Sequence, residues 1–231
     1  MVYTKRLLSP AYYKSGRKTN KFIVTVRPGP HKKDRSIPLV IALRDILKFA
    51  DNTAEAKNIL NMRTVKIDNK TRIDHRFPVG FMDVLSINNS NYRVLVDKKG
   101  LCLKPIEGVQ SKIKLLKIVN KTYNKKGKLQ LGFHDGKTLI MDKDIYKTGD
   151  VVVFDIGSNK IKDLIQFKRE SLVLITEGKN KGKIGKVEDF TIVRGSQPNK
   201  VIVRLGNETI ETLKDYVFIV GQDSPVIDLQ V

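Results

Sequence analysis

The sequence is poor in the residues that most often form covalent cross-links and catalytic or metal sites. Its 231 residues include one cysteine, three histidines and no tryptophan. A lone cysteine cannot close an internal disulfide, so a secreted scaffold held by disulfide bonds is excluded and a reducing, cytosolic compartment is expected. Cys102 lies between Leu101 and Leu103, and we interpret it as a small buried apolar residue rather than a nucleophile.

The histidines are too scattered to suggest a catalytic or metal site. His31, His75 and His134 fall in three different segments, so neither the ligand spacing of a zinc site nor a catalytic triad has local support. A glycine- and lysine-rich loop at 178–183 lacks the Ser or Thr with which a nucleotide-binding loop holds magnesium. We therefore expect no enzyme activity, no cofactor, no metal and no small-molecule substrate.

Long hydrophobic runs are also missing. The N-terminal residues hold only Leu7 and Leu8 between basic side chains, and runs such as 39–43 are far shorter than the ~18 apolar residues that span a bilayer. We expect neither a signal peptide nor a segment inserted in a membrane.

Acidic residues are the other scarce group. The chain has 24 Asp and Glu against 44 Lys and Arg, a formal net charge of +20. Solubility alone needs only about 2–8 net charges in a small domain, whereas a larger surplus attracts polyanions, most commonly nucleic acid. Residues 1–35 hold ten basic side chains and one acidic one, while residues 201–231 hold two basic and five acidic. We therefore expect residues 1–35 to bind nucleic acid and residues 201–231 not to bind it.

Residues 1–35 show no sustained helical or strand period. Their basic side chains are interleaved with aromatic residues, namely Tyr3, Tyr12, Tyr13 and Phe22. This composition predicts a basic N-terminal arm whose cations meet phosphates and whose rings stack on exposed bases of RNA, ordering on contact; an unstructured terminus is the alternative. A Pro-Gly-Pro turn at 28–30 marks the boundary of the arm.

Two short helices are expected next. Ser36 is placed to cap the first, with Pro38 in its first turn, and apolar residues at helical spacing run from Leu39 to Ala50. Its other face carries two basic side chains, Arg44 and Lys48. A second helix begins at Asn52, because Glu55 three residues later completes a capping box.

Strands are expected from Thr64 onward. The segment 64–73 alternates as a hairpin whose turn lies at Asp68-Asn69, where asparagine tolerates a left-handed backbone. Beyond about residue 88, short strands separated by turn signals recur at roughly ten-residue spacing. One of them should point Leu129, Leu131 and Phe133 inward.

The expected fold is therefore α+β and multidomain. It comprises a basic N-terminal arm (1–35), a small module of two helices and a hairpin (36–99), an all-β central domain (100–168) and a small C-terminal β-barrel (169–231).

Six segments carry a family resemblance when they are taken together and in order. They are 27–32 (RPGPHK), 37–39 with 43–45 (IPL, LRD), 77–84 (FPVGFMDV), 133–136 (FHDG), 175–185 (ITEGKNKGKIG) and 215–221 (DYVFIVG). The chain resembles the S4e family of small-subunit (30S/40S) ribosomal proteins of archaea and eukaryotes over nearly its whole length. It ends soon after the last segment, without the longer basic tail of eukaryotic members, and so looks like an archaeal form.

The resemblance implies both a fold and a function. Residues 36–99 look like the S4-type RNA-binding module, and 172–188 look like a KOW element, with Gly182 at the motif's glycine, inside a barrel of the Src-homology-three type. Two loops depart from the family pattern, at Asp68-Asn69-Lys70 and at Glu177. The implied protein is a cytoplasmic, ribosome-bound constituent of the small subunit that binds small-subunit ribosomal RNA, contacts neighbouring ribosomal proteins and supports assembly and translation without catalysis. The alternative is a free-standing RNA-binding or transcription-associated KOW factor.

The candidate RNA-binding residues come from three stretches of the chain. Those of the arm are Lys5, Arg6, Arg17, Lys18, Lys21, Arg27, His31, Lys32 and Lys33. Those of the helical module are Arg44, Lys48, Lys57, Arg63, Lys66 and Arg72. Those of the KOW element are Lys179, Lys181, Gly182, Lys183 and Lys186.

Overall fold

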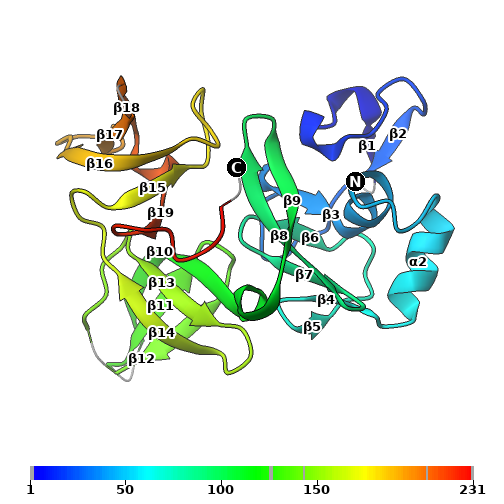
Figure 1. Cartoon of the computed structure of the whole chain (residues 1–231), viewed down its shortest axis with the longest axis horizontal. Helices are drawn as coiled ribbons and strands as arrows, with labels where there is room; N and C mark the ends of the chain where they lie inside the picture. Colours follow the sequence, from blue (N-terminus) through cyan, green and yellow to red (C-terminus); the bar gives the residue numbers. More distant parts are fainter. Residues whose placement is uncertain (1–2, 125–126, 143, 207, 230–231) are drawn as a thin grey trace. The chain divides into compact units, whose positions relative to one another are not determined.

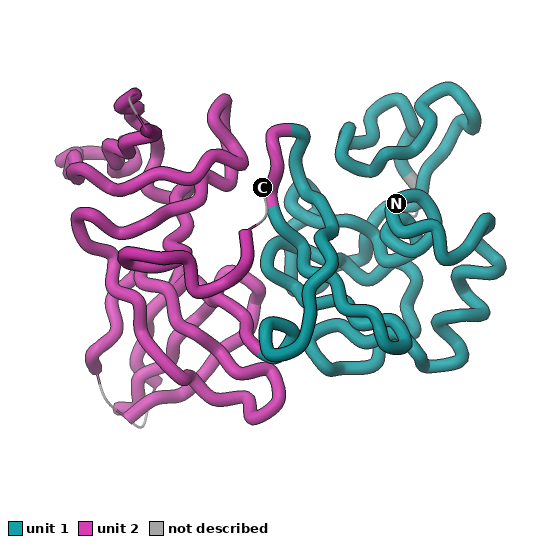
Figure 2. The backbone as a smooth tube through the Cα atoms, viewed as in Figure 1, with its two compact units in different colours: residues 1–95, 99–112 teal, residues 96–98, 113–231 magenta. Residues whose placement is uncertain are grey.

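The computed structural model describes residues 3–124, 127–142, 144–206 and 208–229. The chain is mostly β, with several separate sheets and few helical turns (Figure 1). It forms two compact units (Figure 2), one of residues 1–95 and 99–112 and one of residues 96–98 and 113–231. None of the helices in the described ranges is long and apolar enough to cross a bilayer.

Unit 1 contains two small sheets and one larger sheet. The first small sheet pairs β1 (Tyr3–Lys5) with β2 (Phe22–Val24), and the second pairs β3 (Ser36–Pro38) with β6 (Pro78–Gly80). The larger sheet has the order β5-β4-β7-β8-β9, formed by β4 (Val65–Ile67), β5 (Lys70–Thr71), β7 (Val84–Ile87), β8 (Ser90–Asp97) and β9 (Gly100–Ile106). Short 3-10 turns are η1 (Arg6–Leu8), η2 (Ala11–Tyr13), η3 (Lys33–Arg35) and η5 (Gly108–Lys112).

The segment expected to be an arm is folded in the structure. Its strands β1 and β2 pair in antiparallel register, with Lys5 opposite Phe22. Tyr13, Ile23 and Val26 are buried in unit 1, and the Tyr13 hydroxyl donates to the carbonyl of Ser36 at 3.3 Å. Periodicity missed this packing because the strands have three residues each, too few to show a period.

The first predicted helix exists but is shorter than expected. It starts at Leu39 as α1 (Leu39–Ile41) and runs on as a π-helical turn, η4 (Ala42–Ile46). Ser36 does not cap it, because this residue lies in β3 and its hydroxyl donates to the carbonyl of Lys32 at 2.8 Å. The helix ends before Lys48, whose φ of +57° is left-handed, so Lys48 does not share a helical face with Arg44.

The second helix and the hairpin form as predicted. In α2 (Thr53–Asn61) the side chain of Asn52 accepts from the backbone N–H of Glu55 at 2.9 Å. The Glu55 carboxylate accepts in return from the backbone N–H of Asp51 at 2.8 Å, one residue before the cap. The β4–β5 turn has left-handed Asp68 and Asn69, with φ of +49° and +61°, which is the geometry of a tight hairpin turn.

Unit 2 contains two five-stranded sheets. The first has the order β12-β11-β10-β13-β14, from β10 (Ile113–Tyr123), β11 (Leu129–Phe133), β12 (Thr138–Met141), β13 (Val151–Asp155) and β14 (Lys160–Ile165). The second has the order β18-β17-β16-β15-β19, from β15 (Leu172–Ile175), β16 (Ile184–Thr191), β17 (Lys200–Leu205), β18 (Glu208–Leu213) and β19 (Val217–Gly221). A 3-10 turn, η6 (Lys214–Tyr216), precedes β19.

The alternation of β11 is confirmed. Leu129, Leu131 and Phe133 are buried while the residues between them are partly exposed. Among the residues described after α2, the helical segments are short 3-10 turns, which agrees with the loss of helical pattern near residue 88.

Candidate nucleic-acid interface

Exposure to solvent divides the candidate residues into three groups. The exposed ones are Lys5, Arg17, Lys18, Lys21, Arg27, Lys32, Lys33, Lys48, Lys57, Arg63, Lys66 and Lys179. The partly buried ones are Arg44, Arg72, Lys181, Lys183 and Lys186. The buried ones are Arg6, His31 and Gly182. The buried residues have structural partners inside their units, and direct contact with RNA by the others stays a prediction.

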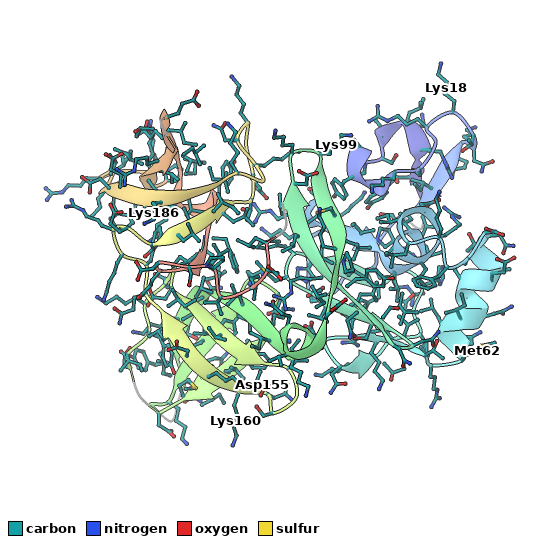
Figure 3. The ribbon with its side chains drawn as sticks, in the orientation of Figure 1. Lys18, Met62, Lys99, Asp155, Lys160 and Lys186 are labelled. Atoms are coloured by element: carbon teal, nitrogen blue, oxygen red, sulfur yellow. The ribbon has the colours of Figure 1, made fainter. Side chains whose placement is uncertain are left out.

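The N-terminal basic loop, residues 14–21, joins η2 to β2. It carries four exposed cations, Lys14, Arg17, Lys18 and Lys21, and Figure 3 shows Lys18 projecting away from the ribbon. The ammonium of Lys21 lies 5.5 Å from the centroid of the Phe22 ring, which is itself 52% exposed. Cations and an open ring face are the two groups that single-stranded nucleic acid engages.

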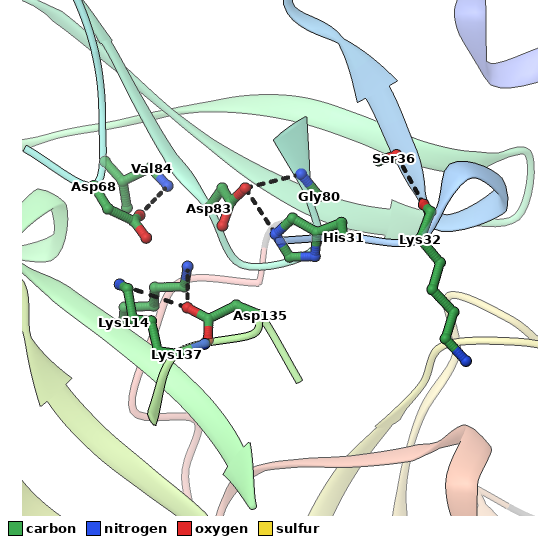
Figure 4. Close-up of polar contacts among 10 residues, drawn as sticks. All are labelled: His31, Lys32, Ser36, Asp68, Gly80, Asp83, Val84, Lys114, Asp135 and Lys137. Atoms are coloured by element: carbon green, nitrogen blue, oxygen red, sulfur yellow. Dashed lines mark hydrogen bonds and ion pairs between the residues drawn. The ribbon is translucent and has the colours of Figure 1, made fainter. Parts of the chain in front are cut away.

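His31 is a buried structural residue. Its Nε2 lies 2.9 Å from Oδ2 of Asp83, which also accepts the backbone N–H of Gly80 at 2.9 Å (Figure 4). A Cβ on Gly80 would collide with the imidazole ring. These three residues therefore hold the segment around His31 against the β6–β7 turn. The imidazole is buried in this contact and does not face the surface.

The helical module presents exposed cations from consecutive elements. Lys57 is exposed on α2, Arg63 follows the end of α2 with a left-handed φ of +59°, and Lys66 points outward from β4 between buried Val65 and Ile67. The capped helix and the tight hairpin hold these side chains on a rigid frame. The Cα partners of Lys66 on the two neighbouring strands are Thr71 and Ser86, which are uncharged.

Two other cations of the module are already engaged. The Arg44 guanidinium donates to both carboxylate oxygens of Asp45, at 3.1 and 2.8 Å, and to the hydroxyl of Thr53 at 2.9 Å. It thus ties η4 to the start of α2. The Arg72 guanidinium stacks 4.4 Å from the centroid of the Phe77 ring. Both contacts leave less of the charge available to a phosphate.

The electrostatics of His75 show that positive charge gathers on this part of unit 1. Burial lowers the pKa of His75, and the charges of Lys57, Arg76 and Arg27 lower it further, while Asp74 opposes them. The sequence does not single out Arg76 as a candidate. Its Nε donates to the carbonyl of Thr25 at 3.0 Å, and this bond fixes the guanidinium near His75. No short-range signal in the sequence brings these residues together.

The loop of the KOW element expected from the sequence, residues 176–183 and named the KOW loop, joins β15 to β16. Its first residue, Thr176, is held in place because the backbone N–H and the hydroxyl of Thr176 both donate to the carbonyl of Tyr216, at 2.8 and 2.9 Å. Gly178 has a φ of +85° and packs near the Tyr216 ring. Gly182 has a φ of +81°, and a Cβ there would lie 2.8 Å from the carbonyl carbon of Asp97, the last residue of β8, which together with Val96 and Lys98 belongs to unit 2. Glycine is required at 182 on both counts.

Lys117 supports the KOW loop indirectly. Its ammonium on β10 donates to the backbone carbonyls of Lys214, Asp215 and Val217, at 3.2, 3.2 and 2.8 Å. These carbonyls flank Tyr216, which holds Thr176. Lys117 therefore joins the two sheets of unit 2 and fixes the segment on which the loop rests.

Unit 2 also contains a fully buried lysine. The ammonium of Lys114, 0% exposed, lies 3.0 Å from Oδ2 of Asp135, and the ammonium of Lys137 approaches the same atom at 3.5 Å (Figure 4). Burial alone would raise the pKa of Asp135, but Lys114, His134 and Lys137 outweigh it and hold the pKa below its usual value.

The expectation that Cys102 is buried is wrong. Cys102 is partly exposed rather than buried, because β9 is the last strand of its sheet. Among the described residues, no three His, Cys, Asp or Glu side chains lie close enough together to hold a metal ion.

Comparison with known proteins gives consistent matches. The model of the ribosomal family S4e matches residues 88–161. The "Small ribosomal subunit protein eS4" of Methanothermobacter thermautotrophicus is 45% identical over 231 residues, which cover 98% of this chain and 95% of that protein. The protein of the same name from Archaeoglobus fulgidus is 41% identical over 235 residues, which cover 100% of this chain and 99% of that protein.

A solved structure matches as well. The crystal structure of the 30S ribosomal protein S4e from Thermoplasma acidophilum has a TM-score of 0.72 and 35% sequence identity, over 82% of this chain and 97% of that chain. The full-length relatives and the shared fold agree with the six ordered segments of the sequence. The chain belongs to the S4e family of ribosomal proteins.

Proposed function

We propose that the chain is a structural constituent of the small ribosomal subunit, where it binds small-subunit ribosomal RNA through exposed cations. It is cytoplasmic, ribosome-bound and without catalytic activity, as its family and the names of its relatives imply. Those names do not favour a free-standing transcription-associated factor. Neighbouring ribosomal proteins are its expected further partners.

One observation carries the RNA-binding proposal: unit 1 exposes cations from neighbouring elements. Lys57 lies on α2, Arg63 follows the end of α2 and Lys66 lies on β4, and all three are exposed. Phosphates are the ligands that such a group of exposed cations attracts, and their binding releases counterions. Within the chain, residues 36–99 act as an S4-type RNA-binding module whose sheet also takes in β9 (Gly100–Ile106), a central β domain follows up to residue 168, and the KOW loop lies in a small barrel formed by 169–231.

A charge-matched pair of variants tests the module surface. Replacing Lys48, Lys57, Arg63 and Lys66 together by Gln should weaken binding to small-subunit ribosomal RNA, measured by filter binding over a salt series. Each lost phosphate contact should reduce the magnitude of the slope of log K against log[salt] by about 0.7–0.9. Arg44 is left unchanged because it holds Asp45 and Thr53.

The control removes the same charge elsewhere. Lys112, Lys147, Lys160 and Lys168 are exposed, and replacing these four by Gln should change the slope much less. Equal losses in the two variants would mean that binding follows net charge and not the module. Sedimentation of lysate through a sucrose gradient gives a second test, because a pool that stays at the top instead of comigrating with small subunits would contradict the ribosomal assignment.

A further inference from the structure

The buried side chain of Arg6 lies beneath the N-terminal basic loop. Only 8% of this residue is exposed. Its Nη1 donates to the carbonyl of Gly16 at 2.9 Å and to the hydroxyl of Thr19 at 2.8 Å. Its backbone N–H donates to the carbonyl of Lys21 at 3.0 Å. One residue therefore holds the loop at its middle and at its end.

The loop closes around this anchor. The Thr19 hydroxyl also donates to the carbonyl of Gly16, at 3.0 Å, so the guanidinium, the hydroxyl and the carbonyl form a closed set of three. The backbone at Gly16 packs closely against Thr19, because a Cβ at position 16 would lie 3.0 Å from the Thr19 methyl group. The contacts span ten and thirteen residues, so they fix the shape of the whole loop.

Burial of Arg6 depends on that shape. A guanidinium cannot shed its charge in a protein, and removing it from water is unfavourable unless its donors are satisfied. The groups that satisfy Nη1 are neutral oxygens of the loop itself, whereas the buried Nε has no hydrogen-bond partner among the described residues, so the contacts of Nη1 carry the compensation. The Arg6 side chain and the middle of the loop therefore stabilise each other, while the β1–β2 pairing and the bond from the Arg6 backbone N–H to Lys21 hold the ends of the loop.

The closed loop directs four cations to the outside. Lys14, Arg17, Lys18 and Lys21 are exposed within eight residues that contain no acidic residue. Like charges at this density repel one another, and the hydrogen bonds from Arg6 to Gly16 and Thr19 oppose this repulsion in the middle of the loop. A chain of phosphates matches several positive charges at short spacing, and the exposed Phe22 ring beside Lys21 adds a surface for a base or sugar.

We propose that Arg6 is a positioning residue and that the N-terminal basic loop is a preformed binding surface for the RNA backbone. The guanidinium of Arg6 does not contact RNA; it sets the four outer cations in place before RNA arrives. The loop then binds without the entropic cost of folding on contact. This inference rests on the proposed function, because it assigns one part of the same RNA surface.

The test compares two substitutions that remove one positive charge from the same region. Arg17→Gln removes an exposed charge, while Arg6→Gln removes the buried anchor. For binding of a small-subunit ribosomal RNA fragment to the full chain, we expect Arg17→Gln to weaken affinity a few-fold and Arg6→Gln to weaken it at least tenfold. The slope of log K against log[salt] should change by about one phosphate for Arg17→Gln and by more than one for Arg6→Gln.

A double-mutant cycle separates positioning from simple charge. When Arg17, Lys18 and Lys21 have been replaced by Gln, adding Arg6→Gln should change affinity less than twofold, since few cations remain to be positioned. A charge acting directly on RNA would give the same factor in both backgrounds. Thr19→Val, which removes the hydroxyl partner and no charge, should weaken binding in the same direction and keeps the test available if Arg6→Gln fails to fold.

A protease provides a readout without RNA. Trypsin should cut after Arg17 and Lys18 faster in Arg6→Gln and Thr19→Val than in the unchanged chain, because the loop has opened. Equal affinities and slopes for Arg6→Gln and Arg17→Gln, with unchanged cleavage, would overturn the role of Arg6 alone. No salt-dependent binding of the RNA by the unchanged chain would overturn the proposed function and this inference with it.

Discussion

Arg6 in unit 1 and Lys114 in unit 2 are both buried cations, but different partners satisfy them. Arg6 donates to a carbonyl and a hydroxyl of one exposed loop. Lys114 faces the carboxylate of Asp135 inside the first sheet of unit 2. The first side chain shapes a surface, whereas the second closes a core. We therefore expect changes at Arg6 to act mainly on RNA binding and changes at Lys114 to act mainly on stability.

The sharpest test of this contrast is Lys114→Met. The substitution leaves the Asp135 carboxylate buried without its nearest cation, and breaking a buried pair from one side typically destabilises by about 3–5 kcal/mol. Urea denaturation should show this loss as a lower unfolding midpoint, while the folded fraction at low urea keeps its affinity for RNA.

The matched control is Lys137→Met. Lys137 faces the same Asp135 oxygen, at 3.5 Å, but its side chain is 26% exposed. Because solvent screens it, we expect a loss of about 1 kcal/mol or less. Equal losses for the two substitutions would show that burial of Lys114 carries no special weight, and the contrast with Arg6 would fail.

Lys117→Met tests whether the effect of removing a cation depends on the chemistry of its partners or on the unit in which it lies. Lys117 belongs to unit 2 but, like Arg6, it donates to neutral oxygens. Hydrogen bonds to charged groups contribute about 1.5–3 kcal/mol to stability, so we expect a loss in that range. The amide hydrogen of Thr176 should also exchange faster, because the Tyr216 carbonyl that holds it loses its support.

Lys160→Met serves as the control for Lys117. Lys160 is exposed at the start of β14, and such surface changes usually stay within about 0.5 kcal/mol. If Lys117→Met destabilises no more than this control, its three carbonyls are equally well satisfied by water and the KOW loop does not depend on them.

The smallest expected effect is on pH dependence. The folded-state pKa of Asp135 is lowered: burial acts to raise it, and the charges of Lys114, His134 and Lys137 outweigh burial. The unfolded chain therefore binds the proton more readily, so this stabilisation is complete above the unfolded pKa of about 3.9 and is lost as the pH falls through the lower folded value. Urea midpoints between pH 5 and 2.5 should fall less steeply for Asp135→Asn than for the unchanged chain; parallel curves would contradict the pairing. Arg6, whose partners do not titrate, should give no such difference.

Local chemistry made part of the fold predictable. The capping box of Asn52 and Glu55 acts over three residues, and the turn at Asp68-Asn69 requires only two left-handed residues. The alternation of Leu129, Leu131 and Phe133 likewise reflects a single strand. Each of these signals lies within a stretch short enough for a sequence pattern to capture it.

The parts that could not be predicted depend on distant partners. Ser36 has the chemistry of a helix cap, but pairing with Gly80 draws it into β3 instead. His31 is buried against Asp83, a partner that lies 52 positions away in the sequence. Lysine in a strand ordinarily points to solvent, and nothing near Lys114 reveals that Asp135 will reach it.

The same limit applies to the candidate RNA-binding residues. A positive charge in the sequence predicts a side chain that can bind RNA only if that side chain is exposed and unpaired. Arg6 is buried, and Arg44 forms an ion pair with Asp45. Lys57, Arg63 and Lys66 remain exposed, and the pattern of α2 and β4 was enough to place them outward. Arg76 could not be chosen in advance, because only the fold brings it to the same place as Lys57.

The outer edge of β18 matters for the chain before it meets RNA. In the described part of the chain, β18 ends its sheet and pairs with β17, so its free edge could be extended by the same strand of a second copy. Glu208 and Glu211 are exposed along it, and although Glu211 pairs with Lys200 at 3.2 Å within the sheet, two such strands laid edge to edge would bring the carboxylates of both copies together. Repulsion between like charges opposes that arrangement. Negative charge along this edge thereby disfavours edge-to-edge pairing of two free copies of the chain.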